Sequence, residues 1–154
     1  QGFLQGGREP VEVRSILLDT NAYGAFLQGT PEAIRILQHV PLIALSSVVL
    51  GELMGGFSAG SREKENRDRL RQFLDSERVQ VFNVDQQTSE HYAAIYLKLR
   101  RRGTPIPTND IWIAATALQH NLAIFTFDGH FSRIDGLTSG SRIEDFLVAP
   151  PSPG

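Results

Sequence analysis

The chain of 154 residues contains no cysteine, which excludes disulfide bonds, thiol nucleophiles and thiolate metal sites. No apolar run approaches the roughly 18 residues that a membrane span requires, and no segment has the order of a signal peptide. Basic residues are not in excess, because 15 Lys and Arg stand against 17 Asp and Glu. We therefore expect a cytoplasmic protein without a membrane partner, and bulk charge argues against binding of a long nucleic acid.

The composition is that of a folded domain, with 41% hydrophobic and 21% charged residues. A chain of this length forms one domain and buries roughly 68–70% of its unfolded surface. We expect residues 1–14 to be disordered or to derive from outside the natural chain, and residues 15–148 to form the domain. The tail at residues 149–154 contains three prolines and is expected to be disordered.

Short apolar runs alternate with segments of helical period. The predicted strands are residues 16–18, 42–45, 79–84 and 122–126. Ser46 is expected to cap a helix that ends at Gly55-Gly56, and Thr108-Asn109 to cap another. Parallel strands need crossover helices, so this order predicts an α/β fold of three layers with a mainly parallel central sheet of four or five strands flanked by helices.

Four acidic residues occur where chain leaves or approaches this sheet. Asp19 and Asp128 follow the first and last predicted strands, whereas Glu52 and Asp110 lie early in helices. Because α/β sheets place their sites beyond the carboxyl ends of the strands, all four are expected to converge. Clustered carboxylates repel one another unless cations neutralise them, and Mg²⁺ or Mn²⁺ prefers such oxygen ligands. The scattered histidines and the absence of cysteine disfavour zinc.

Each acid also has a purely structural interpretation. Asp19 suits a helix cap, Asp110 suits the positive end of a helix dipole, and Asp128 precedes glycine as in an ordinary turn. Glu52 is harder to explain in this way, because it lies among apolar residues where an unpaired carboxylate is costly.

Four segments resemble those of a known family. They read LLDTN at residues 17–21, SSVVLGELMG at 46–55, TNDIWIAATA at 108–117 and TFDGHF at 126–131. Their size and order are similar to PIN-domain ribonucleases, and most to VapC, the toxin of bacterial VapBC toxin–antitoxin pairs. The resemblance spans roughly residues 15–147 and implies a PIN-like fold.

The resemblance also implies a metal-dependent endoribonuclease that uses one or two Mg²⁺ or Mn²⁺ ions to hydrolyse RNA phosphodiester bonds. The implied catalytic and metal-binding residues are Asp19, Glu52, Asp110 and Asp128. The expected supporting polar residues are Thr20, Asn21, Thr126 and His130. The implied partners are an RNA substrate, a VapB-like antitoxin and a second copy of the chain.

This chain departs from the family pattern at two positions. Phe127 stands where many relatives have a polar residue, and His130 stands where a further acid is common. Asp128 is therefore the acid whose role as a direct ligand is open, and His130 is a candidate phosphate contact.

Two basic segments are candidates for contact with RNA. Arg100, Arg101 and Arg102 form a local cluster, and residues 62–71 carry two more basic than acidic side chains. Either segment could steer RNA. Equally, the three arginines suit the negative end of a helix dipole, and residues 62–71 suit a solvated helix face.

Two rival functions stay open at this point. A haloacid-dehalogenase-type phosphatase also begins with a strand that ends in Asp, but it normally has a second Asp where this chain has Asn21. A degenerate PIN domain would bind RNA or protein without catalysis. The presence of all four acids favours an enzyme over this binding module.

Overall fold

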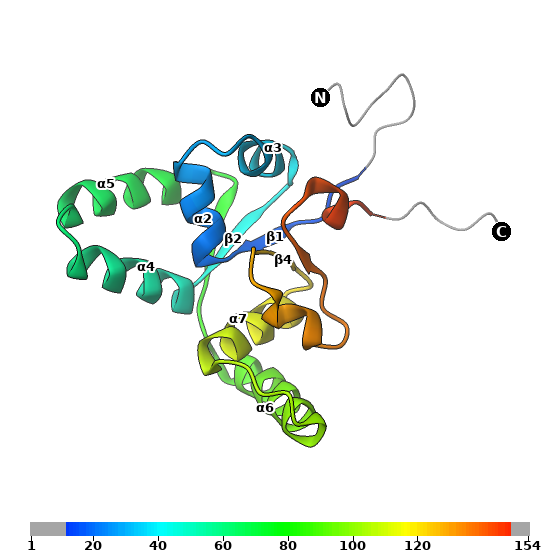
Figure 1. Ribbon diagram of the computed structural model, residues 1–154. Coiled ribbons are helices and arrows are strands. Elements are labelled where there is room, and N and C mark those ends of the chain that lie inside the picture. Colours follow the sequence, from blue (N-terminus) through cyan, green and yellow to red (C-terminus); the bar gives the residue numbers. More distant parts are fainter. Residues whose placement is uncertain (1–11, 149–154) are drawn as a thin grey trace.

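A five-stranded, all-parallel sheet forms the centre of the computed structural model, which describes residues 12–148 (Figure 1). The strands are β1 Ile16–Leu18, β2 Ile43–Ser46, β3 Val79–Phe82, β4 Ala123–Phe125 and β5 Ser139–Gly140. Their order across the sheet is β3-β2-β1-β4-β5, so the first strand lies in the middle. The predicted α/β fold with a parallel sheet is confirmed.

Helices surround the sheet. They are α2 Thr20–Leu27, α3 Pro31–His39, α4 Ser47–Ala59, α5 Glu63–Leu74, α6 Gln86–Arg102 and α7 Thr108–Gln119, followed by the 3₁₀ helices η1 Gly129–Arg133 and η2 Ile143–Phe146. Figure 1 shows α2 and α3 on one side of the sheet and α6 and α7 on the other. Helices α4 and α5 form a hairpin that extends away from the sheet (Figure 1).

Burial explains the apolar sequences of the central strands. All residues of β1 and β4 are fully buried, and a parallel strand covered on both faces requires a continuous apolar run. Strand β3 lies at the edge and is only partly buried, which accounts for its mixed pattern. It ends at Phe82, two residues earlier than the sequence predicts.

Two helices begin directly after strands at the carboxyl edge of the sheet. Asp19 is the N-cap of α2 and accepts a hydrogen bond from the Thr20 backbone N–H. Ser46 is the N-cap of α4, and its hydroxyl accepts from the Val49 N–H at 3.1 Å. These caps satisfy helix donors that have no partner within the helix. They also fix where Asp19 and Glu52 stand relative to the sheet.

Two predicted helix boundaries are wrong. Helix α4 continues through Gly55-Gly56 and ends at Ala59, because glycine within a helix costs only about 1 kcal/mol and does not by itself end it. Helix α7 is not capped by Thr108, which is its first residue. Pro107 is the N-cap and has no side-chain donor or acceptor to offer. Its extended backbone nevertheless sets the entry of the chain into the helix.

The folded domain begins before residue 15, where we expected its start. Val13 forms an antiparallel bridge with Leu147, and the Arg14 N–H donates to the Phe146 carbonyl at 2.8 Å. The expected disordered segments lie outside the described residues, except for residues 12–14. Within residues 12–148, none of the helices combines the length and apolarity needed to cross a bilayer.

The short strand β5 depends on a close approach at Gly140. A side chain there would collide with the Asp145 carboxylate, which accepts hydrogen bonds from the Ser141 and Arg142 N–H groups. The Gly140 carbonyl in turn accepts from the Thr126 N–H at 2.9 Å. This glycine therefore helps to hold Thr126 at the end of β4.

Candidate active site

Asp19 lies at the carboxyl end of β1, and its side chain is only 6% exposed. One carboxylate oxygen accepts from the Thr20 N–H at 2.8 Å, and the other accepts from the Thr126 hydroxyl at 2.7 Å. Thr126 is itself buried at the end of β4, the neighbouring strand. Adjacent parallel strands therefore hold this carboxylate in a fixed orientation.

Burial raises the pKa of Asp19 above its usual value. The hydrogen bonds from Thr126 and Thr20 oppose this shift, whereas the negative charges of Asp110 and Glu52 add to it. The three acids are thus close enough to repel one another, although they come from three separate segments. The sequence prediction that acids converge at this edge agrees with this arrangement.

Glu52 lies in the second turn of α4, and both of its carboxylate oxygens are hydrogen bonded. Oε1 accepts from the Thr20 hydroxyl at 2.7 Å, and Oε2 accepts from the Asn109 amide at 3.2 Å. Asn109 was interpreted from sequence only as a helix cap, yet its side chain links α7 to α4. Its position next to Asp110 was the one signal that could have assigned it to the site.

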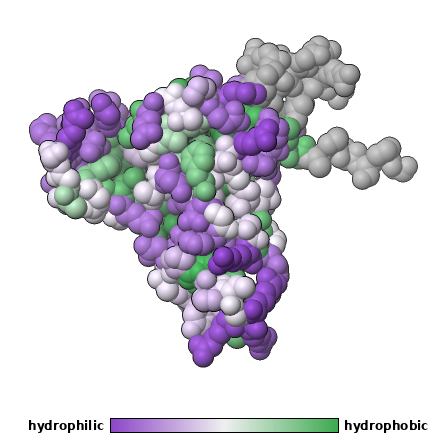
Figure 2. All heavy atoms as spheres, viewed as in Figure 1, coloured by the Kyte–Doolittle hydropathy of each residue, from purple (hydrophilic) through white to green (hydrophobic). Residues whose placement is uncertain are grey.

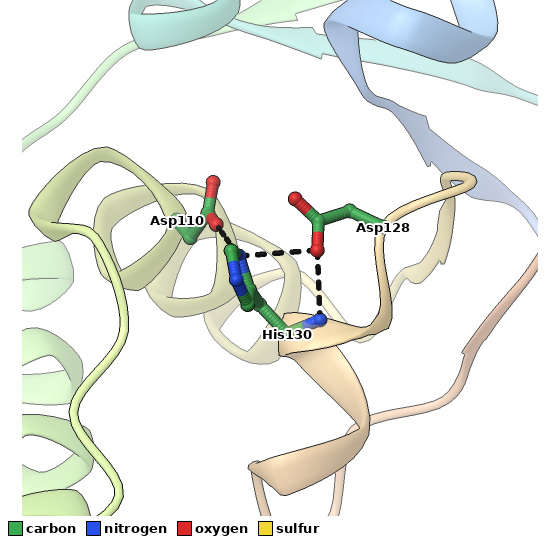
Figure 3. A group of neighbouring side chains, drawn as sticks. All are labelled: Asp110, Asp128 and His130. Carbon is green, nitrogen blue, oxygen red and sulfur yellow. Dashed lines mark hydrogen bonds and ion pairs between the residues drawn. The ribbon is translucent and has the colours of Figure 1, made fainter.

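Asp110, Asp128 and His130 form the other half of the site (Figure 3). His130 Nδ1 lies 2.9 Å from Asp110 Oδ2 and 3.0 Å from Asp128 Oδ1, so the ring bridges the two carboxylates. Asp128 is the N-cap of η1, and its Oδ1 also accepts a hydrogen bond from the His130 backbone N–H at 2.9 Å. One ligand atom from each of the three residues lies within 4.8 Å of the others.

The electrostatics of Asp110 resemble those of Asp19. Burial raises the pKa of Asp110, the hydrogen bond from His130 lowers it in part, and the charges of Asp128 and Glu52 raise it. Among the ion pairs between residues 12 and 148, none joins the four acids to Lys or Arg. Negative charge is therefore concentrated here without a permanent positive partner.

The remaining predicted polar residues divide into two groups. Thr126 connects both halves of the site, because its hydroxyl donates to Asp19 and accepts from the Asp128 N–H at 3.0 Å. Asn21 lies nearby but contacts no acid, and its side-chain oxygen accepts from the Phe127 N–H at 3.1 Å. The structure thus brings the four acids together with Thr20, Thr126 and His130, and it gives Asn21 a different contact.

The three arginines at the end of α6 are not part of this cluster. Arg102 forms an ion pair with Asp135, and Arg100 donates to the Tyr96 hydroxyl at 3.1 Å. All three lie in the last turn of the helix, as the dipole interpretation expects. The surface over this end of α6 is strongly hydrophilic (Figure 2).

Comparison with protein-family models identifies the class. The model of the PIN domain matches residues 16–137. This range includes the four acids of the site and strands β1 to β4. The chain therefore belongs to the PIN-domain family. The match to the PIN-domain model does not support a haloacid-dehalogenase-type phosphatase.

Individual relatives narrow the assignment. Ribonuclease VapC1 of Haemophilus influenzae is 33% identical over 126 residues, which cover 79% of this chain and 92% of the relative. The tRNA(fMet)-specific endonuclease VapC of Salmonella typhimurium is 31% identical over 133 residues, which cover 84% of this chain and 96% of the relative. This chain is a member of the VapC family, the ribonuclease toxins of type II toxin–antitoxin systems.

Solved structures agree with this family. VapBC2 from Rickettsia felis, bound to a DNA fragment from its promoter, superposes with a TM-score of 0.72 at 26% identity. The alignment covers 82% of this chain and 97% of that chain. VapBC from Salmonella typhimurium bound to DNA gives a TM-score of 0.70 at 26% identity, covering 83% and 97% of the respective chains.

Proposed function

We propose that this VapC-family ribonuclease is a metal-dependent endonuclease and that Asp19, Glu52, Asp110 and Asp128 form its catalytic centre. The observation that carries the proposal is the convergence of these acids without Lys or Arg, in a family of ribonucleases. Acids whose pKa is raised by burial and by like charges are typical of functional sites.

The donor set fits Mg²⁺ or Mn²⁺. Asp110, Asp128 and His130 offer three atoms at mutual distances that one cation can span, and carboxylate oxygens are the preferred ligands of both ions. His130 Nδ1 lies between two carboxylates, 2.9 Å from Asp110 Oδ2 and 3.0 Å from Asp128 Oδ1. The imidazole thus stands where a cation is electrostatically favoured.

The chain's own residues orient the site. Thr126 fixes Asp19 and the backbone of Asp128 through one hydroxyl, while Thr20 and Asn109 each hold one oxygen of Glu52. When bound, a divalent ion lowers the pKa of a water molecule and polarises the phosphate. The fixed carboxylates would hold such an ion without having to reorganise during the reaction.

The arginines of α6 receive a limited role in this proposal. Because Arg100 and Arg102 already have partners within the protein, we assign Arg100, Arg101 and Arg102 only to long-range steering of RNA. Such steering weakens as ionic strength rises, whereas the contacts within the acidic site are short and partly buried.

We also propose a VapB-like antitoxin and a homodimer. The support for the antitoxin is that the similar solved structures from Rickettsia felis and Haemophilus influenzae are VapBC complexes, whereas the homodimer is implied only by the resemblance to the family. Co-purification with the product of a neighbouring antitoxin gene tests the first partner. Light scattering of the isolated chain tests the second, and a monomer at high concentration would contradict it.

Cleavage of labelled RNA in Mg²⁺, in Mn²⁺ and in EDTA tests the enzyme. We expect internal cleavage with either ion and none in EDTA. Calorimetric titration with Mn²⁺ separates this proposal from a degenerate binding module. Absence of both metal binding and cleavage, with RNA binding retained, would favour the module.

A further inference from the structure

Phe127 is the most exposed large hydrophobic side chain of residues 12–148, with 52% of its surface accessible. It lies between Thr126 and Asp128, two residues whose contacts build the acidic site. Single exposed apolar side chains are common on protein surfaces, so what distinguishes Phe127 is its place in the chain between two residues of the site. None of the contacts within the site uses this ring.

The structure holds Phe127 in place from two sides. Its backbone N–H donates to Asn21 Oδ1 at 3.1 Å, and its ring lies 5.8 Å from the buried ring of Phe125. Consecutive Cα atoms are about 3.8 Å apart, so the backbone of Phe127 lies next to that of Asp128 and that of Thr126, whose hydroxyl orients Asp19. An exposed aromatic side chain is therefore anchored between two residues of the candidate catalytic centre.

We propose that Phe127 is a stacking platform for a nucleobase of the RNA substrate, next to the bond that is cleaved, and that Asn21 positions it. This inference rests on the proposed function and deepens it. Every base has a flat face that stacks on an aromatic ring, independently of its sequence. The base is the uncharged part of a nucleotide, so the surrounding carboxylates do not repel it as they repel phosphate.

The surroundings of Phe127 favour a base over a protein partner. Its chain neighbours Thr126 and Asp128 are polar, Gly129 is exposed, and Asn21 beside it is exposed as well. Protein docking surfaces have an apolar centre of several side chains, whereas one flat ring among polar groups suits a single base. Stacking also supplies affinity that a chain of net charge −2 does not obtain from bulk electrostatics.

Stacking on Phe127 requires an RNA base that is not paired in a duplex. Bases within a duplex are already stacked on their neighbours, so a protein ring reaches only a base from a single strand, a loop or a bulge. The site should therefore prefer unpaired RNA around the cleaved bond.

Binding of two matched probes tests this inference. One probe is a short oligo-adenylate, and the other is an abasic ribose-phosphate backbone of equal length and charge. In an Asp110→Asn background with EDTA, hydrolysis does not consume the probes. Phe127→Leu should weaken oligo-adenylate binding about 10- to 100-fold and leave the abasic probe unchanged. Leu97→Ala, at an exposed apolar residue on α6, is the control and should change neither.

Fluorescence gives an independent readout, because Trp112 is the only tryptophan of the chain. In a Trp112→Phe background, Phe127→Trp should be quenched by oligo-adenylate and not by the abasic probe. Asn21→Ala should reduce the discrimination between the probes, whereas a purely structural role would weaken binding of both equally. Asn21→Ser should restore part of the discrimination.

The outcomes distinguish the stacking role of Phe127 from the proposed nuclease activity. RNA binding with the same affinity in Phe127→Leu, or quenching by both probes, would overturn the stacking inference and leave the nuclease intact. Failure of the wild-type chain to bind or cleave any RNA would overturn the proposed function and this inference with it.

Discussion

Acidic residues crowd two regions of this protein, the candidate site and helix α5. The pKa values of two acids in the first region and of two in the second move in opposite directions. Burial raises the pKa of Asp19 and Asp110 in the site. On α5, hydrogen bonds from Ser58 and Arg67 lower the pKa of Glu63, and hydrogen bonds from Lys64 and Arg71 lower that of Asp68. The same residue type is thus destabilised as a carboxylate in one region and stabilised in the other.

The partners explain the difference. On α5, acids and bases alternate at helical spacing, as in the pairs Glu63–Arg67 at 3.0 Å and Lys64–Asp68 at 3.1 Å. Figure 2 shows hydrophilic side chains along the outer edge of the α4–α5 hairpin, with hydrophobic ones beside them. In the site, the acids come from the end of β1, from α4 and α7 and from the loop after β4. Among residues 12–148 they pair with His130 but with no Lys or Arg. A cluster of acids without Lys or Arg indicates a cation site, whereas a high local density of charged residues does not.

The largest effect on RNA cleavage is expected from Asp110→Asn, which removes one of the acids that distinguish the site from α5 by pairing with no Lys or Arg of residues 12–148. The substitution removes one negative ligand but preserves the shape of the side chain, so we expect RNA cleavage to fall by more than about 100-fold. Circular dichroism should show an unchanged fold, and cleavage of labelled RNA at matched protein concentration measures the loss.

Asp68→Asn on α5 is the matched control for charge. It should leave cleavage unchanged, because the Asp68 carboxylate contacts only Lys64 and Arg71. Full activity in Asp110→Asn would remove Asp110 from the catalytic centre, and an equal loss in both variants would point to net charge as the cause.

Thr126→Val should reduce cleavage by about 10- to 100-fold, the usual effect of removing a group that orients a metal ligand. Valine retains the shape but leaves Asp19 Oδ2 without its donor and the Asp128 N–H without its acceptor. Thr126→Ser keeps the hydroxyl and should recover most of the activity. A Ser variant as inactive as the Val variant would show that packing, and not the hydroxyl, is what matters.

The sequence predicted the parts of the site that are attached to regular patterns. Asp19 and Asp128 follow strands made of apolar runs, and Ser46 marks the helix that carries Glu52. Such local signals, combined with the parallel sheet, were enough to place the acids at one edge.

The contacts between segments could not be predicted in this way. The amide of Asn109 reaches Glu52 across 57 residues of chain, and the bridge of His130 between two acids depends on the turn of η1. Strand β5 has only two residues, too few for any period, and its place beside β4 depends on the close packing at Gly140.

Asp19→Asn should change stability in a pH-dependent way. Because the folded-state pKa of Asp19 is raised, its contribution to folding is fully present below its ordinary pKa and is lost as pH rises through the folded-state value. At neutral pH the metal-free variant should therefore melt a few degrees above the wild type. At about pH 3.5, where Asp19 is largely protonated in both states, this difference should disappear.

Thermal unfolding in EDTA across this pH range measures the effect. Added Mn²⁺ should stabilise the wild type at neutral pH and stabilise Asp19→Asn less, since a ligand that binds only the folded state raises its melting temperature. A variant less stable than the wild type at neutral pH would mean that the hydrogen bonds of the carboxylate outweigh its burial.

The smallest effect is expected on α5, where Lys64→Ala removes one of the two partners of Asp68. The Lys64 side chain is 91% exposed and Asp68 keeps its bond to Arg71, so water and the second base replace what is lost. Exposed pairs of this kind contribute little, because solvent and salt screen them and holding two long side chains together costs entropy. We expect the melting temperature, the cleavage rate and the Mn²⁺ affinity to stay within error of the wild type. A change in Mn²⁺ affinity would show that the charges of α5 act on the site, and the contrast between the two regions would then be one of degree.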